Sequence, residues 1–300
     1  MITPRLLVPG NRVRVIAPSG QVNMKRCEEG IAMLEEWGLK VERGKNIYMR
    51  YGLFAGDDSQ RLDDLQDAMD DPDVKAIFCA RGGYGLSRII DRIDLRRFSE
   101  SPKWIIGFSD ITLLHLWINM NCGVATLHGE MVANYSDRRK SRETLASLRQ
   151  TLFEGPVDYS WDTNHFVPGK VESVITGGNL SLLCNITGTS VNRWLEGKIL
   201  FIEETGEFLY RLDRMLSDLR LSGILGSIAG MVVGGITGME DSKTPFGKLA
   251  EEIVMESVSI YGFPVAMGFP AGHQDDNRAF TSGSEVKFSV ENGKAELKFL

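Results

Sequence analysis

The stretch that decides the fold of this chain is Trp104-Ile105-Ile106-Gly107-Phe108-Ser109-Asp110-Ile111-Thr112. The apolar run before Gly107 predicts a buried strand, and a helical pattern begins at Ile111. A strand that enters a sharp turn and leaves as a helix is the geometry of a nucleophile elbow, which presents a hydroxyl at a helix N-terminus. A simpler interpretation makes Ser109 a helix N-cap. The local pattern alone favours the cap, so the rest of the chain must decide.

Around this turn, short apolar runs alternate with helical patterns, which is typical of an α/β protein with a parallel sheet. Strands are predicted at 12–17, 76–79, 104–106 and 124–127, and helices at 24–37 and 60–69. The second half predicts strands at 171–175, 198–202, 230–233, 285–289 and 296–300, and helices at 209–221 and 246–258. Turn-rich sequence separates the halves. We therefore expect a domain at 1–155, a linker at 156–170 and a second domain at 171–300.

Composition excludes several classes of protein. The chain has 300 residues, 43% of them hydrophobic and 25% charged, with a net charge of −6, and no basic stripe for nucleic acid is visible. No run of 18 apolar residues predicts a membrane span. The N-terminus lacks the pattern of a secretory signal, and the four cysteines form no CxxC pair, so we expect a cytoplasmic protein. The four histidines lie far apart, so no metal is expected.

Three segments carry residue types that catalysis uses. The run Ala80-Arg81-Gly82-Gly83-Tyr84-Gly85 follows a predicted strand, and its glycines allow the backbone to approach an anion closely. Glu203 stands at the end of another predicted strand, and His273 lies in a loop bounded by Gly and Pro. Ser109, Glu203 and His273 together supply the residue types of an acyl-transfer triad.

The remaining candidates have simpler explanations. Glu204 and Glu207 are expected in a solvated loop, since only one of two adjacent strand residues faces a given site. His115 is expected on a helix after Ser109, and His165 in the linker. His128, at the end of a predicted strand, is an intermediate case.

These motifs resemble the LD-carboxypeptidases of serine peptidase family S66. The resemblance rests on the runs at 17–20, 80–85, 106–112, 126–129, 177–180, 201–204, 210–214 and 272–273, in order along nearly the whole chain. Two positions depart from the family pattern: Glu130 stands where Pro is usual, and Glu204 where Asp is frequent.

The resemblance implies a flavodoxin-like N-terminal domain, a smaller β-rich C-terminal domain and a homodimer. It implies Ser109 as nucleophile, Glu203 as the triad carboxylate and His273 as general base, with no cofactor. The oxyanion hole would use the N–H of Asp110 and an N–H from the Gly82-Gly83 loop. The implied reaction releases the terminal D-alanine from murein tetrapeptides. Arg81 is a candidate for the substrate carboxylate, because a guanidinium matches that group.

Two alternatives stay open. One is a hydrolase of the microcin-immunity type from the same family, which cleaves a peptidyl or aminoacyl bond to a nucleotide-like group. The other is a ligand-binding protein without catalytic activity. The three complete triad positions argue against the second, whereas the triad does not exclude the first.

Overall fold

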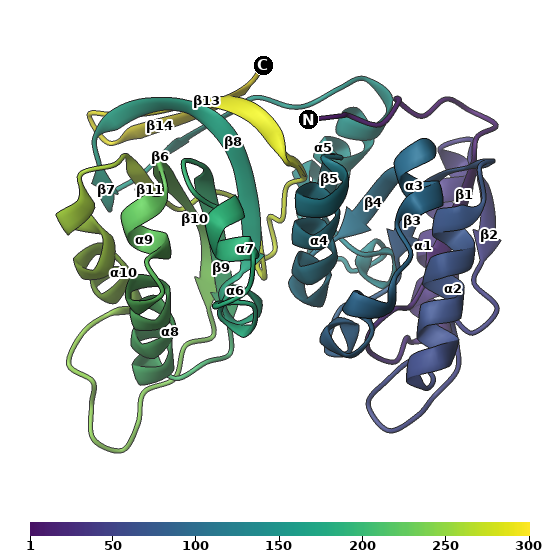
Figure 1. Cartoon of the computed structure of the whole chain (residues 1–300), viewed down its shortest axis with the longest axis horizontal. Helices are drawn as coiled ribbons and strands as arrows, with labels where there is room; N and C mark the ends of the chain where they lie inside the picture. The colour runs from purple at the N-terminus through teal and green to yellow at the C-terminus, as the bar shows by residue number, and fades with distance from the viewer. The chain divides into compact units, whose positions relative to one another are not determined.

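The structure, a computed structural model, describes all residues from 1 to 300. The chain forms two compact units. The first consists of Met1–Pro156 and Asp275–Gly283, and the smaller second unit consists of Val157–Gln274 and Ser284–Leu300 (Figure 1). The segment after Gln274 thus returns to the first unit, and the stretch 156–170, expected as a linker, holds the two short strands β6 and β7.

The first unit is built on a sheet with the order β2-β1-β3-β4-β5-β12. Its strands are β1 (Arg12–Ile16), β2 (Lys40–Arg43), β3 (Val74–Cys79), β4 (Trp104–Gly107), β5 (Thr126–His128) and β12 (Phe280–Ser282). Neighbours from β2 to β5 are parallel, and β12 joins β5 antiparallel. The order 2-1-3-4-5 is that of flavodoxin-like folds, as the sequence resemblance implied.

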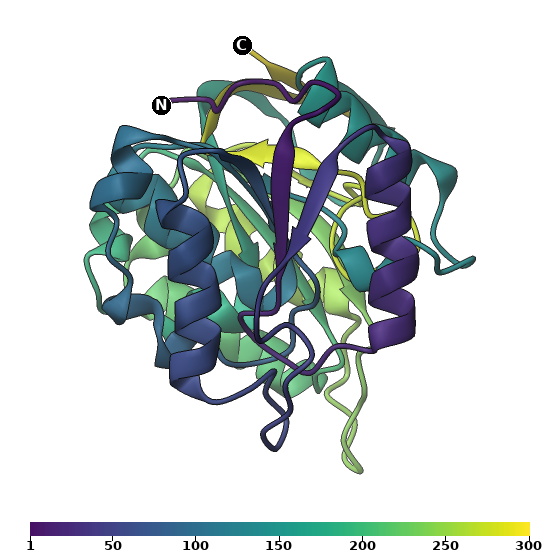
Figure 2. The ribbon, with the colours of Figure 1, turned by 90° about the vertical axis from the view of Figure 1, so that its right-hand side faces the viewer.

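Helices cover both faces of this sheet. They are α1 (Met24–Glu36), α2 (Asp58–Asp70), α3 (Arg96–Glu100), α4 (Thr112–Cys122) and α5 (Arg142–Phe153), with short 3₁₀ turns at Leu86–Arg88, Ile90–Arg92, Ser109–Ile111 and Val132–Asn134. Figure 2 shows α1 and α2 on opposite faces of the edge made by β1 and β2. Asn23 caps α1, and Asp57 with Gln60 forms a capping box on α2. Both helices therefore begin where the sequence supplies a side-chain acceptor.

The second unit contains a mixed sheet with the order β6-β14-β13-β8-β9-β10-β11-β7. Its strands are β6 (Tyr159–Asp162), β7 (Phe166–Val167), β8 (Gly169–Asn179), β9 (Ile199–Thr205), β10 (Gly230–Thr237), β11 (Val265–Met267), β13 (Ser284–Glu291) and β14 (Lys294–Phe299). Its helices are α6 (Leu180–Asn185), α7 (Val191–Trp194), α8 (Leu209–Leu221), α9 (Ile224–Ser227) and α10 (Ala250–Val258), followed by a 3₁₀ turn at Ser259–Tyr261. Strands β8 to β11 are parallel, and the others pair antiparallel. The parallel strands bring their carboxyl ends to one edge, where polar groups can gather.

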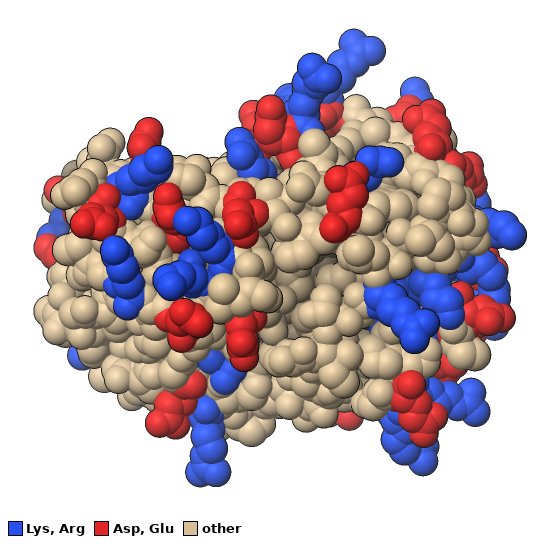
Figure 3. All heavy atoms as spheres, turned by 90° about the horizontal axis from the view of Figure 1, so that it is seen from above, with Lys and Arg blue, Asp and Glu red and all other residues tan.

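Surface charge is mixed in sign. On the face in Figure 3, Lys and Arg side chains stand among Asp and Glu side chains. Several charged residues of the chain are paired, for example Lys298 with Glu296 at 3.0 Å and Lys170 with Glu291 at 3.3 Å. None of the helices combines the length and apolarity needed to cross a bilayer.

Candidate active site

Ser109 occupies the turn between β4 and α4 in a strained backbone conformation. Its φ is +63°, one of only two positive values outside glycine in the chain. A non-glycine residue in the left-handed region costs on the order of 1–2 kcal/mol and is typical of functional turns. The 3₁₀ turn at Ser109–Ile111 and α4 both lack a side-chain cap. The N-cap interpretation of Ser109 is therefore wrong, and the backbone has the geometry of a nucleophile elbow.

The Gly82-Gly83 loop lies directly against this serine. A Cβ built on Gly82 would stand 2.9 Å from Ser109 Cβ and 3.1 Å from its Oγ, so only glycine fits there. Gly83 has a φ of +103°, which also favours glycine. Neither residue donates its backbone N–H to another group of the chain. These N–H groups are thus available to a ligand anion beside the Ser109 hydroxyl.

Two buried histidines support the elbow without facing solvent. His115 Nε2 lies 2.8 Å from the Gly107 carbonyl oxygen. Burial lowers the pKa of His115 to about 4, so its ring is neutral at pH 7 and Nε2–H donates to that carbonyl. His128 stacks on Phe280 with ring centroids 4.8 Å apart and packs near Phe108 at 5.8 Å. Both histidines are therefore part of the core behind the turn.

In the second unit, Glu203 and His273 form a hydrogen-bonded pair. His273 Nδ1 lies 2.7 Å from Glu203 Oε2, and the backbone N–H of His273 donates to the same oxygen at 3.1 Å. Glu203 is 0% exposed at the end of β9, whereas the His273 side chain is 25% exposed. A buried carboxylate on Nδ1 fixes the tautomer of the ring and leaves Nε2 for proton transfer.

Gly272 allows the His273 loop to pass over the carboxylate. Its φ is +105°, and a Cβ there would stand 2.7 Å from Glu203 Cβ and 2.8 Å from Glu203 Oε2. Thr237 Oγ1 donates to the His273 carbonyl oxygen at 2.7 Å. His273 is thus held at three points: its ring Nδ1, its backbone N–H and its backbone carbonyl oxygen.

The prediction that Glu204 lies in a solvated loop is wrong. β9 continues to Thr205, and Glu204 is 3% exposed on the opposite side of the strand from Glu203. Its Oε2 accepts from the Ser181 N–H at 2.7 Å, and its Oε1 accepts from Asn179 Nδ2 at 3.0 Å. Burial raises the pKa of Glu204. Asn179 and Ser181 stand over twenty residues earlier in the sequence, so no local pattern predicts these two bonds. Glu207 is half-buried and pairs with Arg211 at 3.3 Å.

The hydrogen bonds of the Asp110 carboxylate could not be predicted either, because its donors lie 91 and 24 positions away in the chain. This side chain is buried and accepts hydrogen bonds from Ser19 and from the Leu86 N–H. Arg81 beside the glycine loop is exposed and donates one N–H to the Gln21 carbonyl oxygen at 2.8 Å. It forms no ion pair within the chain, so its guanidinium remains available to an anion.

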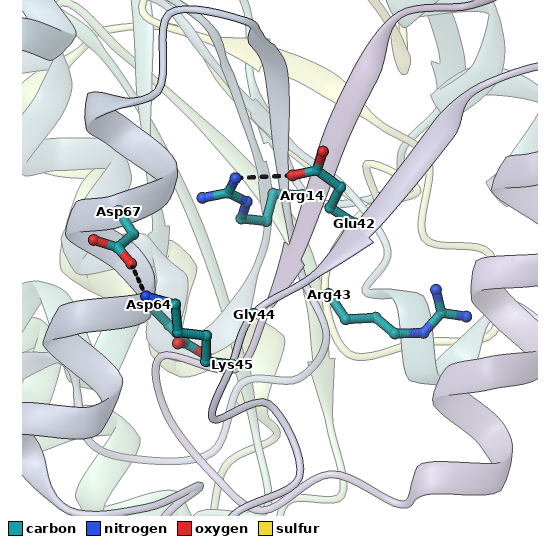
Figure 4. A pocket seen from close by; sticks show the side chains of 7 residues that line it. All are labelled: Arg14, Glu42, Arg43, Gly44, Lys45, Asp64 and Asp67. Atoms are coloured by element: carbon teal, nitrogen blue, oxygen red, sulfur yellow. Dashed lines mark hydrogen bonds and ion pairs between the residues drawn. The ribbon is translucent and has the colours of Figure 1, made fainter.

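Another hollow of the first unit carries no residue of the elbow. This pocket of about 280 Å³ is lined by Arg14, Glu42, Arg43, Gly44, Lys45, Asp64 and Asp67. Its charges neutralise one another, for Arg14 pairs with Glu42 at 2.8 Å and Lys45 with Asp67 at 2.9 Å (Figure 4). We assign it no role in the chemistry. Nowhere in the chain do three or more His, Cys, Asp or Glu side chains gather as metal ligands would.

Comparison with known proteins agrees with these features. Residues 13–129 match the family model of the LD-carboxypeptidase N-terminal domain, and residues 172–288 match that of the C-terminal domain. The chain is 34% identical to a probable murein peptide carboxypeptidase of Bacillus subtilis, over 98% of this chain and 94% of the relative.

Two solved structures share the fold. The muramoyltetrapeptide carboxypeptidase from Oxalobacter formigenes superposes with a TM-score of 0.86 at 28% identity, covering 96% of this chain and 98% of that one. The microcin C7 self immunity protein, solved with aspartyl sulfamoyl adenosine, gives a TM-score of 0.87 at 20% identity, covering 99% and 98%. The second likeness is one of fold alone. With both of its domains matched, this chain belongs to the LD-carboxypeptidase family, peptidase family S66.

Proposed function

We propose that this chain is a serine-type LD-carboxypeptidase that releases the terminal D-alanine from murein tetrapeptides through an acyl-enzyme. The observation that carries the proposal is the strained φ of +63° at Ser109, in a turn that supports no helix cap. Support for the substrate comes from the relatives, whose names specify murein peptide and muramoyltetrapeptide carboxypeptidases.

In the proposed mechanism, Ser109 Oγ attacks the scissile carbonyl while His273 Nε2 takes its proton. Glu203 holds Nδ1–H and stabilises the imidazolium. The N–H of Asp110 and an N–H of the Gly82-Gly83 loop stabilise the oxyanion. His273 returns the proton to the departing amine of D-alanine, leaving an ester on Ser109. Water, activated by the same imidazole, then hydrolyses that ester and restores the hydroxyl.

In this mechanism, the elbow of the first unit and the Glu203–His273 pair of the second unit act in one reaction. Arg81 binds the terminal carboxylate of the substrate, since its guanidinium has no acidic partner and stands next to the glycine loop. The reaction needs neither metal nor cofactor, because the imidazole activates the hydroxyl. Activity should therefore survive exhaustive chelation, and loss that added zinc restores would contradict this part of the proposal.

A cytoplasmic location and a homodimer belong to the same proposal. The four cysteines form no disulfide, which suits a reducing compartment. Cell fractionation and sedimentation at several protein concentrations test these two points separately.

The decisive experiment is mass spectrometry of murein tetrapeptides incubated with the enzyme. We expect conversion to tripeptide with release of free D-alanine, and no conversion by Ser109→Ala. The microcin-immunity alternative predicts instead cleavage of an aminoacyl sulfamoyl nucleotide with little tetrapeptide turnover. If neither substrate reacts, and a fluorophosphonate probe fails to label Ser109, the chain is a binding protein.

A further inference from the structure

Two loops of the first unit contact the elbow, which is the turn at 107–111. They are 17–20 after β1 and 80–86 after β3. The two loops touch through their backbones, for the Gly20 N–H donates to the Gly82 carbonyl oxygen at 2.9 Å. A Cβ on Gly20 would lie only 2.8 Å from that oxygen. The position of the Gly82-Gly83 loop is therefore coupled to the loop that carries Ser19.

The Asp110 carboxylate fastens both loops to the elbow. Its Oδ2 accepts from Ser19 Oγ at 2.6 Å and from the Leu86 N–H at 2.9 Å. The residue is 0% exposed, and its Oδ1 is buried without a hydrogen-bond partner. A buried carboxylate with an unused oxygen costs free energy. An arrangement kept at that cost, within the turn of Ser109, points to a role in the site.

Arg61 also bonds to the same two loops. Its guanidinium, 0% exposed, donates from Nη1 to the Pro18 carbonyl oxygen at 2.7 Å and to the Gly85 carbonyl oxygen at 2.9 Å. Burial raises the pKa of Asp110, and the bonds from Ser19 and Leu86 and the charge of Arg61 act against that rise. The Asp110 carboxylate and the Arg61 guanidinium thus bond to the same pair of loops.

We propose that the Asp110 carboxylate, acting through Ser19 and Leu86, is a positioning group that sets the Gly82-Gly83 N–H groups opposite Ser109 before the oxyanion forms. Donors that are already in place stabilise developing charge without reorganising, and losing one typically lowers kcat by about 10²–10³. This inference rests on the proposed function. It gives Ser19 and Arg61, which the proposed triad does not use, a part in the chemistry.

Asp110→Asn is the informative substitution because it preserves volume. The amide nitrogen must either face the donors Ser19 and Leu86 or occupy the buried place of Oδ1 without an acceptor, so the fastening is weakened in both orientations. The matched control is Asp64→Asn. Asp64 is another buried carboxylate of the first unit, 4% exposed, and it accepts from the Asn46 N–H at 2.9 Å and from Asn46 Nδ2 at 3.0 Å.

The test measures kcat and KM for D-alanine release, and the Ki of a phosphonate that mimics the tetrahedral intermediate. We expect Asp110→Asn to lower kcat by about 10²–10³ with KM within threefold, and to raise the phosphonate Ki by a similar factor. Asp64→Asn should leave kcat, KM and Ki within threefold. The Ki matters because a partly unfolded sample would lower the apparent kcat without changing Ki.

An Asp110→Asn enzyme with wild-type kcat and Ki overturns the inference. If that variant does not fold, Ser19→Ala decides: a parallel change in kcat and Ki of about tenfold supports the inference, and unchanged values overturn it. Ser109→Ala is run alongside. If it retains activity, the proposed function itself fails, whereas an inactive Ser109→Ala with a normal Asp110→Asn removes the positioning role alone.

Discussion

Glu203 Oε2 accepts two hydrogen bonds from one residue, His273, through Nδ1 at 2.7 Å and the backbone N–H at 3.1 Å. The adjacent Glu204 binds a different set of donors on the other side of β9, from Asn179, Ser181 and Thr205. Two neighbouring carboxylates are thus buried for different purposes: one orients an imidazole, and the other holds the end of β8 and the start of α6.

The two glutamates should therefore respond differently to the same substitution. We expect Glu203→Gln to lower kcat by roughly 10⁴, as for other triad carboxylates. In Glu204→Gln an amide N–H₂ faces backbone and side-chain donors, so it should cost about 1–3 kcal/mol of unfolding free energy and leave kcat within tenfold. Kinetics and urea denaturation of both variants check this. The reverse order would move the catalytic carboxylate by one residue.

Gly272→Ala should damage the Glu203–His273 pair, because the new Cβ would overlap the carboxylate. We expect a fall in kcat of about 10² or more, since the imidazole is displaced from its partner. Gly268→Ala is the matched control: its φ of +84° carries a similar backbone strain, but its Cβ would meet nothing nearer than 3.9 Å. The backbone strain should cost each variant about 1 kcal/mol of stability, and the overlap with Glu203 should add to that loss in Gly272→Ala. Equal kcat values in the two would contradict the assigned role of Gly272.

The strain at Ser109 predicts an inverted order of stability between two inactive variants. At a φ of +63° the Cβ of alanine is strained and glycine has no Cβ. The unfolding free energy of Ser109→Gly should therefore exceed that of Ser109→Ala by about 1 kcal/mol. At Ser59, an exposed position in the first turn of α2, alanine should be the more stable of the two. Denaturant unfolding of all four variants tests the inversion. The same order at both sites would mean that the elbow is not strained in solution.

The amphipathic helix at 209–221 could be predicted because its signal is local, whereas the local pattern at Ser109 favoured a helix cap and only the motifs elsewhere in the chain favoured an elbow. The apolar spacing gives the same bounds for α8 as the structure, Leu209–Leu221. Strand β2 was missed because Lys40-Val41-Glu42-Arg43 is a short polar edge strand without apolar alternation, and Arg12 and Arg14 of β1 pair with its Glu42. The helix expected from Phe246 begins only at Ala250.

The partners of the buried carboxylates could not be predicted from the sequence. Asp110 bonds to Ser19, which is 91 positions away, and Glu204 bonds to Asn179, which is 25 away. Acidic residues are mostly exposed, so burial is expected only where partners are known. Those partners came together only through the strand order of each sheet.

His115 gives the protein a pH dependence that can be measured apart from catalysis. Burial lowers its pKa in the folded protein to about 4, while in the unfolded chain it should titrate near the usual value of about 6.5. Between these values the unfolded state binds the extra proton, so the contribution of His115 is complete above pH 6.5 and is lost as the pH falls toward 4. The full difference amounts to roughly 3 kcal/mol.

We therefore compare the wild type with His115→Gln, whose amide N–H can still donate to the Gly107 carbonyl oxygen. The unfolding free energy of the wild type should fall more steeply from pH 6.5 to 4 than that of the variant. Subtracting the two curves cancels the contributions of the buried acids Asp64, Asp110 and Glu204, whose raised pKa values are common to both proteins. Parallel curves would mean that His115 is protonated or exposed in the folded protein, and the neutral donor behind the elbow would then be excluded.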